Sequence, residues 1–223
     1  VHGRHAYKGL ALLATTAMIL RLELVCLAVP AYLWTWWHHQ RRFVYVFMTG
    51  AVTCAGSIAL SVLVDSYFWR KRFLWPEGHA VIFNVIEGRS AEWGVSPPWT
   101  YVVRDLPRIL FAAFPLALLG CTRRSSFRLP LVLLVCTHVG LMSFLAHKEW
   151  RFLVYIVPLC NMLAAQGASM LIRTYLGRWL MLGLVGTSAA LWILGTYVSI
   201  YNYPGGEALS ILHTQMQEAQ VVH

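Results

Sequence analysis

The chain has 223 residues, of which 58% are hydrophobic and only 12% are charged, and its formal net charge is +9. This composition excludes an ordinary soluble domain, and ten tryptophans with ten tyrosines fit aromatic belts at two membrane interfaces. The positive charge favours anionic partners such as membrane lipid headgroups or a phosphorylated substrate, and we expect no nucleic acid as a partner of a membrane-embedded chain.

The first apolar run covers residues 9–36 and is interrupted by Arg21 and Glu23. As one helix it would be about 42 Å long, which is enough for one tilted span but short for two. Charged side chains at membrane depth usually face protein interior or water, so we expect the helix to break at this pair. A re-entrant pair of helices remains an alternative.

Later apolar runs predict further membrane-spanning helices. The clearest is the run at 43–64, and shorter or interrupted runs follow at 109–120, 131–146, 153–172 and 179–200. His138 lies inside one of these runs, where we expect a hydrogen-bonded core residue rather than a proton relay. The sequence therefore predicts an all-α polytopic membrane protein in which 1–223 form one transmembrane domain.

The loops between the runs predict the orientation of the chain. Those with arginine and no acid belong in the cytoplasm by the positive-inside rule, namely 37–42, 121–128 and 173–178. The opposite side then holds an amphipathic loop, a short turn and the start of a tail: 65–107, 147–152 and 201–223. Every acidic residue except Glu23 falls on that side. We therefore expect a single non-cytoplasmic face to carry the polar chemistry.

The predicted loop 65–107 interleaves aromatic residues with polar ones and is divided by prolines and glycines, which favours short interfacial helices joined by turns. Aromatic faces stack on sugar rings while polar groups bind hydroxyls, so this loop is a candidate sugar cleft. An aromatic belt without binding function is the alternative. The candidate acceptor or cleft residues are Asp65, Trp69, Trp75, Glu77, Trp93 and Trp99.

The turn at 147–152 reads His-Lys-Glu-Trp-Arg-Phe and concentrates chemistry between two apolar runs. Lys148 and Arg151 supply fixed positive charge and several donors, which suits a lipid-linked phosphate. His147 and Glu149 are suited to holding sugar hydroxyls or moving protons. Basic and aromatic residues also anchor span ends without other function, and that reading stays open. The five cysteines show no metal-type spacing, so we expect no metal and no cofactor.

These motifs together resemble glycosyltransferase family 22, whose members use dolichyl-phosphate mannose. The hexapeptide 147–152 resembles the HKExRF signature of that family, and its order with Trp-Pro-Glu-Gly (75–78), Glu-Trp-Gly-Val-Ser-Pro (92–97) and Asn-Tyr-Pro-Gly-Gly (202–206) strengthens the resemblance. The resemblance runs from about Arg21 to the C-terminus. It implies a GT-C-type helix bundle in the endoplasmic reticulum membrane with its active face toward the lumen.

The resemblance also implies a reaction: transfer of mannose from dolichyl-phosphate mannose, in α-1,6 linkage, to a dolichyl-pyrophosphate-linked oligosaccharide in N-glycan assembly. Its donor site would use His147, Lys148, Glu149 and Arg151. Family members carry an acidic pair in a first luminal loop that supplies the base; nothing here matches it, so we expect a fragment, inactive alone, that holds no catalytic residue. A sibling enzyme forming α-1,2 linkages or acting on glycosylphosphatidylinositol, or a non-enzymatic lipid carrier, remains an alternative.

Overall fold

A computed structural model describes residues 2–38 and 43–221, and this part of the chain is helical with no strand. The predicted all-α class is confirmed. The chain divides into two compact units, residues 1–170 and 171–223. Three helices within the described ranges are long and apolar enough to cross a membrane: Val44–Trp69, Trp150–Leu171 and Tyr175–Met216.

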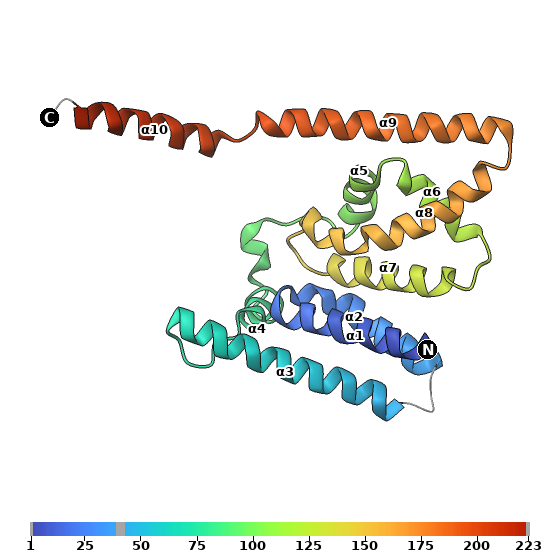
Figure 1. The fold of residues 1–223 in the computed structure, drawn as a ribbon, viewed down its shortest axis with the longest axis horizontal. Helices are drawn as coiled ribbons and strands as arrows, with labels where there is room; N and C mark the ends of the chain where they lie inside the picture. The colour runs from blue at the N-terminus through green and yellow to red at the C-terminus, as the bar shows by residue number, and fades with distance from the viewer. Residues whose placement is uncertain (1, 39–42, 222–223) are drawn as a thin grey trace. The chain divides into compact units, whose positions relative to one another are not determined.

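The first apolar run forms two helices with a break between them, as predicted. Helix α1 (His2–Ile19) ends where the Thr16 carbonyl accepts the amides of both Leu20 and Arg21, at 3.0 and 3.2 Å. Arg21 is extended, and a short 3₁₀ turn, η1 (Leu22–Leu24), leads into α2 (Val25–His38). The two helices pack against one another and run in opposite directions (Figure 1).

Helix α3 (Phe43–Trp69) packs on α1 and extends further than the predicted span at 43–64. Asp65 and Trp69 therefore lie on its last turns, and the boundary predicted at Val64 is wrong. The helix continues because residues 65–69 contain neither glycine nor proline. Short helices joined by turns follow, as predicted: α4 (Pro76–Val81), η3 (Ile82–Ile86), η4 (Arg89–Trp93), η5 (Tyr101–Asp105) and α5 (Leu106–Leu110).

The predicted span at 109–120 is not one continuous helix. Phe111 has a positive φ of 46°, which breaks the backbone between α5 and α6 (Ala113–Thr122). Helix α6 is only about 15 Å long at 1.5 Å per residue, half the thickness of a bilayer core. Helix α7 (Arg128–Ser143), the 3₁₀ helix η6 (Trp150–Ile156) and α8 (Val157–Leu171) complete the first unit.

Two glycines allow α6 and α8 to approach closely. A Cβ at Gly120 would overlap the Leu163 carbonyl, and a Cβ at Gly167 would overlap the Leu116 carbonyl. Close approach through small residues is a common way for helices to pack in membranes.

The core of the first unit lies between the α1–α2 break and the segment that joins α7 to α8. Its buried side chains include Ala17, Leu24, Tyr101, Leu153 and Ile156. His138 on α7 is also fully buried, and its Nε2 donates to the Phe152 carbonyl at 2.7 Å. The prediction of a hydrogen-bonded core histidine is confirmed.

The second unit consists of α9 (Tyr175–Ile200) and α10 (Pro204–Val221). The Thr174 hydroxyl caps α9 by accepting the Gly177 amide at 3.0 Å. In the first turn of α10, a Cβ at Gly206 would overlap the Tyr203 ring, so the glycine leaves room for that ring. The segment predicted as a polar tail is thus helical from Pro204 to Val221.

Candidate functional site

The predicted turn at 147–152 connects α7 to η6. Helix α7 ends at Ser143, residues 144–149 lie outside the helices, and Glu149 is extended with φ −121° and ψ 136°. Trp150, Arg151 and Phe152 then form the first turn of η6. The Phe152 carbonyl is fixed by His138, so the residue that follows Arg151 is anchored to the core.

One side of this turn is bound to the segment 96–101. The Ser96 amide donates to the Ala146 carbonyl at 3.0 Å, and the Glu149 amide donates to the Tyr101 hydroxyl at 3.3 Å. The Tyr101 ring is fully buried, and burial raises the pKa of its hydroxyl to about 12. The phenol therefore stays neutral at physiological pH and acts as a fixed support for the turn.

Lys148 belongs to the bound side of the turn. Its side chain is only 6% exposed, and its ammonium donates to the carbonyls of Leu145 and Ser96 at 2.6 and 3.1 Å, while lying 6.0 Å from the Tyr101 ring centroid. Burial lowers the pKa of this ammonium. A buried charge needs such partners, and here they are carbonyls of the protein. The placement differs from the phosphate contact expected from the sequence.

The other side of the turn carries the predicted charges in a row. The Glu149 carboxylate lies between His147, whose Nε2 is 3.3 Å from Oε1, and Arg151, whose guanidinium binds Oε2. The Arg151 side chain is 58% exposed, in contrast to Lys148. Three of the four predicted donor residues are thus brought together on one open edge.

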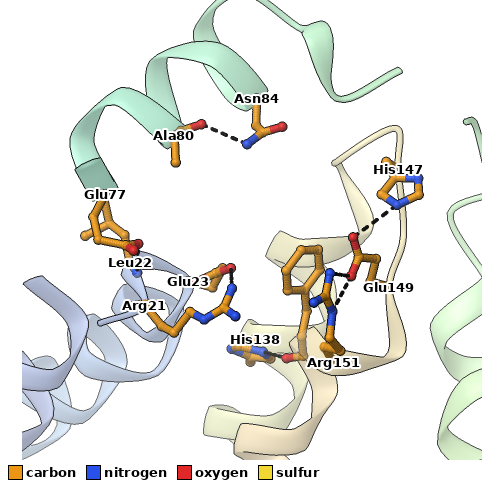
Figure 2. A network of polar contacts seen from close by, with 11 residues as sticks. Arg21, Leu22, Glu23, Glu77, Ala80, Asn84, His138, His147, Glu149 and Arg151 are labelled. Carbon is orange, nitrogen blue, oxygen red and sulfur yellow. Dashed lines mark hydrogen bonds and ion pairs between the residues drawn. The ribbon is translucent and has the colours of Figure 1, made fainter. Parts of the chain in front are cut away.

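A second polar group lies at the break between α1 and α2. Arg21 Nη1 is 3.7 Å from Glu23 Oε1, and Glu77 Oε2 accepts the Leu22 amide at 2.9 Å. Burial raises the pKa of Glu77 above its usual value. The hydrogen bond from the Leu22 amide lowers this pKa, the nearby charge of Glu23 raises it, and the charge of Arg21 lowers it. Figure 2 shows this group in the same region as His147, Glu149 and Arg151 of the turn.

The sequence Trp75-Pro76-Glu77-Gly78 explains how Glu77 reaches the break. Pro76 begins α4, and Gly78 lacks the Cβ that would overlap the Trp75 ring. The indole N–H of Trp75 donates to the Met18 carbonyl at 2.9 Å, which ties α4 to the end of α1. Trp75 and Glu77, predicted as cleft residues, thus hold the break.

The remaining predicted cleft residues lie at the surface or on α3. The Asp65 carboxylate accepts the Ser61 hydroxyl one turn earlier at 2.6 Å. Trp69, Trp93 and Trp99 are 68%, 69% and 63% exposed. The loop between Trp93 and Trp99 passes the turn, since the Cβ position of Gly94 would be 3.9 Å from His147 Nδ1.

Sequence reasoning missed Arg21 and Glu23 as site residues, although two charges in an apolar run were the signal that marked the break. It also missed Ser96 and Tyr101: Ser96 lies in the motif at 92–97, which carried the family resemblance but no site role, and Tyr101 was one of several aromatic residues in the loop. Across residues 2–38 and 43–221, no three histidine, cysteine or acidic side chains gather in a way that could hold a metal ion.

Comparison with known proteins gives a consistent result. Residues 3–223 match the Alg9-like mannosyltransferase family. The chain is 34% identical to a Schizosaccharomyces pombe protein named "Probable Dol-P-Man:Man(7)GlcNAc(2)-PP-Dol alpha-1,6-mannosyltransferase", over 96% of this chain and 41% of that protein. A Drosophila melanogaster protein named as the same α-1,6-mannosyltransferase is 40% identical, over 70% of this chain and 24% of its own length.

A Danio rerio protein named "GPI alpha-1,2-mannosyltransferase 3" is 30% identical over 47% of this chain and 19% of its own length. The chain spans less than half the length of these curated relatives. No solved structure matches it.

Proposed function

Because this chain belongs to the Alg9-like mannosyltransferase family, we propose that it is part of an enzyme that transfers mannose from dolichyl-phosphate mannose to a dolichyl-pyrophosphate-linked oligosaccharide, in α-1,6 linkage. Relatives named for this activity are 31% to 40% identical over 70% to 96% of the chain, whereas relatives named for GPI mannose transfer are 26% to 30% identical over 47% to 66%. This difference favours the α-1,6 reaction over the sibling reaction on GPI intermediates.

The observation that carries the proposal is the open edge formed by His147, Glu149 and Arg151. Transfer breaks the bond between the anomeric carbon of mannose and a phosphate oxygen, and the leaving dolichyl phosphate gains negative charge. Positive charge fixed beside that oxygen lowers the barrier. The exposed guanidinium of Arg151 is suited to bind phosphate with two parallel hydrogen bonds.

Glu149 and His147 orient Arg151 in this proposal. Glu149 holds one edge of the guanidinium, so the remaining N–H donors point away from it toward a ligand. His147 contacts the other oxygen of Glu149 and limits its rotation. Lys148 contributes indirectly, because its ammonium holds the turn on the segment 96–101.

The acceptor sugar lies against the aromatic loop in this proposal. Trp93 and Trp99 expose most of their rings, and aromatic faces of this kind stack on sugar rings. The attacking hydroxyl must lose its proton to a base. We assign that role to none of the residues that the structure describes.

The experiment that tests the function uses the complete enzyme that contains this chain, supplied with dolichyl-phosphate mannose. Defined acceptors would be a seven-mannose dolichyl-pyrophosphate oligosaccharide and a mannosylated GPI intermediate, with the new linkage mapped by glycosidase digestion and mass spectrometry. We expect α-1,6 mannose on the first acceptor only. Transfer to the GPI intermediate alone would replace the proposal with the sibling reaction, and transfer to neither would overturn it.

We also propose that the enzyme lies in the endoplasmic reticulum membrane with the turn facing the lumen. The positive-inside assignment from the arginine-rich loops supports this orientation. An N-glycosylation acceptor sequence inserted between Val95 and Ser96 of the complete enzyme should be glycosylated, whereas one inserted between Arg124 and Ser125 should not. The reverse pattern would contradict the orientation.

A further inference from the structure

The polar group at the α1–α2 break has no role in the reaction as described above, and the inference drawn from it rests on the proposed function. Two tertiary contacts fix this break: Glu77 accepts the Leu22 amide at 2.9 Å, and the Trp75 indole donates to the Met18 carbonyl at 2.9 Å. A break held by contacts from a segment more than 50 residues away is a built feature of the fold. Arg21 and Glu23 are the charged side chains that it displays.

The break faces the same region as the open edge of the turn. The charges of Glu23, Arg21, Glu77 and Arg151 all act on the half-buried Tyr155 phenol. Charges from three separate segments therefore lie within electrostatic reach of one hydroxyl group. Figure 2 shows Arg21 and Glu23 from the break near Arg151 from the turn. We therefore treat the break and the turn as the two walls of one polar region.

Glu23 has fewer hydrogen-bond partners than a carboxylate requires. Its Oε1 is 3.7 Å from Arg21 Nη1, which is too long for a good hydrogen bond, and its Oε2 is buried without a partner. The side chain is 21% exposed although Oε2 is buried, so Oε1, which has only the long contact to Arg21, is the oxygen that a ligand can approach. Because a carboxylate only accepts hydrogen bonds, the missing partner must be a donor.

A second carboxylate beside Glu23 narrows the chemistry of that partner. Burial and Glu23 already disfavour the charge of Glu77, and among the described residues of this wall the two carboxylates outnumber the one cation, Arg21, so an anionic ligand here would meet repulsion. A neutral ligand with several hydroxyl donors can donate hydrogen bonds to these two carboxylates. The opposite wall, formed by the turn, supplies Arg151 as the cation for a phosphate. A sugar linked to a phosphate combines both kinds of group.

We propose that Glu23 binds a sugar hydroxyl opposite Arg151, and that Arg21 and Glu77 position it. The sugar is either the mannose of the donor or a terminal mannose of the acceptor, since both present hydroxyls of the same chemistry. Glu23 is then a substrate-binding residue, and the break between α1 and α2 positions it at the site.

The test compares Glu23→Gln with the matched control Glu87→Gln in the complete enzyme. Glu87 is also an acid near an arginine, with Arg89 Nη1 3.8 Å from its carboxylate, but its side chain is 48% exposed and outside the polar region described above. The measurements are kcat, the KM values for donor and acceptor, and the inhibition constant of dolichyl phosphate, which lacks the sugar. The thermal midpoint of each variant reports folding.

We expect Glu23→Gln to raise one of the two KM values about tenfold, the effect of losing a hydrogen bond to a charged group, with an unchanged thermal midpoint. A donor contact would raise the donor KM and leave inhibition by dolichyl phosphate unchanged; an acceptor contact would raise the acceptor KM instead.

Unchanged KM values in an active enzyme would overturn the role of Glu23 while leaving the proposed function intact. A fall in thermal midpoint without a change in either KM would also overturn it, because Glu23 would then be purely structural. If the unmodified enzyme failed to use dolichyl-phosphate mannose, the proposed function itself would fail. Glu77→Gln provides a second variant, since its amide oxygen still accepts the Leu22 amide, and we expect the same KM to rise by a smaller factor.

Discussion

Arginines lie at both ends of the first unit, but they have different partners. At the end formed by the α1–α2 break and the 147–152 turn, Arg21 contacts Glu23 and Arg151 contacts Glu149. At the opposite end, where α6 leads into α7, Arg123 donates to the Ser169 hydroxyl and Arg128 to the Cys121 carbonyl (Figure 1). At one end each arginine pairs with a carboxylate two residues away, whereas at the other end the arginines donate to a hydroxyl on α8 and to a carbonyl on α6.

This difference separates two uses of the same residue type. Arginine with neutral partners anchors a helix end and follows the positive-inside rule. Arginine fixed by a carboxylate is oriented for a ligand, since the carboxylate holds one edge of the guanidinium and leaves other donors free. At these two ends of the unit, the partner of the arginine, rather than its charge, separates the candidate site from an anchor.

The largest effect should come from Arg151→Ala in the complete enzyme. Removing a donor that stabilises developing negative charge costs about 100- to 1,000-fold in kcat, and we expect a loss in this range in kcat/KM. Arg128→Ala at the opposite end should retain nearly full activity, as measured by mannose transfer to the seven-mannose acceptor. Equal losses from both variants would remove the distinction between the two ends.

The next largest effect should fall on stability, at the arginine-anchored end. Gly120→Ala or Gly167→Ala would place a methyl group on a carbonyl of the facing helix, and overpacking of this kind costs about 1–3 kcal/mol or more. The control is Gly140→Ala on α7, where the added Cβ meets no atom within 4 Å. The measurement is the thermal midpoint of each variant in detergent. Midpoints equal to that of the parent enzyme for all three variants would contradict the close approach of α6 and α8.

A comparable but smaller loss of stability should follow Lys148→Met, which keeps the apolar stem and removes the ammonium. Hydrogen bonds from charged donors contribute about 1.5–3 kcal/mol, and the carbonyls of Leu145 and Ser96 would lose theirs. We therefore expect a lower thermal midpoint, in contrast to Arg151→Ala, which should leave the midpoint unchanged. Lys71→Met, at an exposed lysine, is the control. If Lys148→Met had normal stability and a raised donor KM, the result would instead support the direct phosphate contact predicted from the sequence.

Lys148 and Arg151 show how far the sequence predicts this site. The sequence of the hexapeptide placed both residues as cations at the end of a span. Their residue types alone predicted a phosphate contact for each of them. Their different placement depends on Ser96 and Tyr101, about 50 residues earlier, whose approach to the turn follows from packing of the whole unit. No local pattern indicates which cation faces the protein and which faces outward.

The fold was predictable where local physics dominates. Two charges in an apolar run predicted the break at Arg21 and Glu23, because their exposure at membrane depth is costly. The break at Phe111 was not predictable, since a positive φ at a phenylalanine is disfavoured locally and arises from tertiary packing. The approach of Glu77 to Glu23 was likewise not predictable, because it depends on tertiary contacts: Trp75 binds the end of α1 and Glu77 binds η1.

The smallest effect concerns pH and is specific to the end that pairs opposite charges. Burial raises the pKa of Glu77 in the folded protein, so the folded state binds this proton more tightly than the unfolded chain. The resulting stabilisation is complete below the ordinary pKa of glutamate and is lost as pH rises through the raised value. Thermal midpoints of the complete enzyme should therefore decline across that interval, and Glu77→Gln should flatten the decline while its amide oxygen still accepts the Leu22 amide. Glu87→Gln should keep the decline. If Glu77→Gln kept it as well, another group would be responsible, and the unfavourable charge at the α1–α2 break would have to be assigned elsewhere.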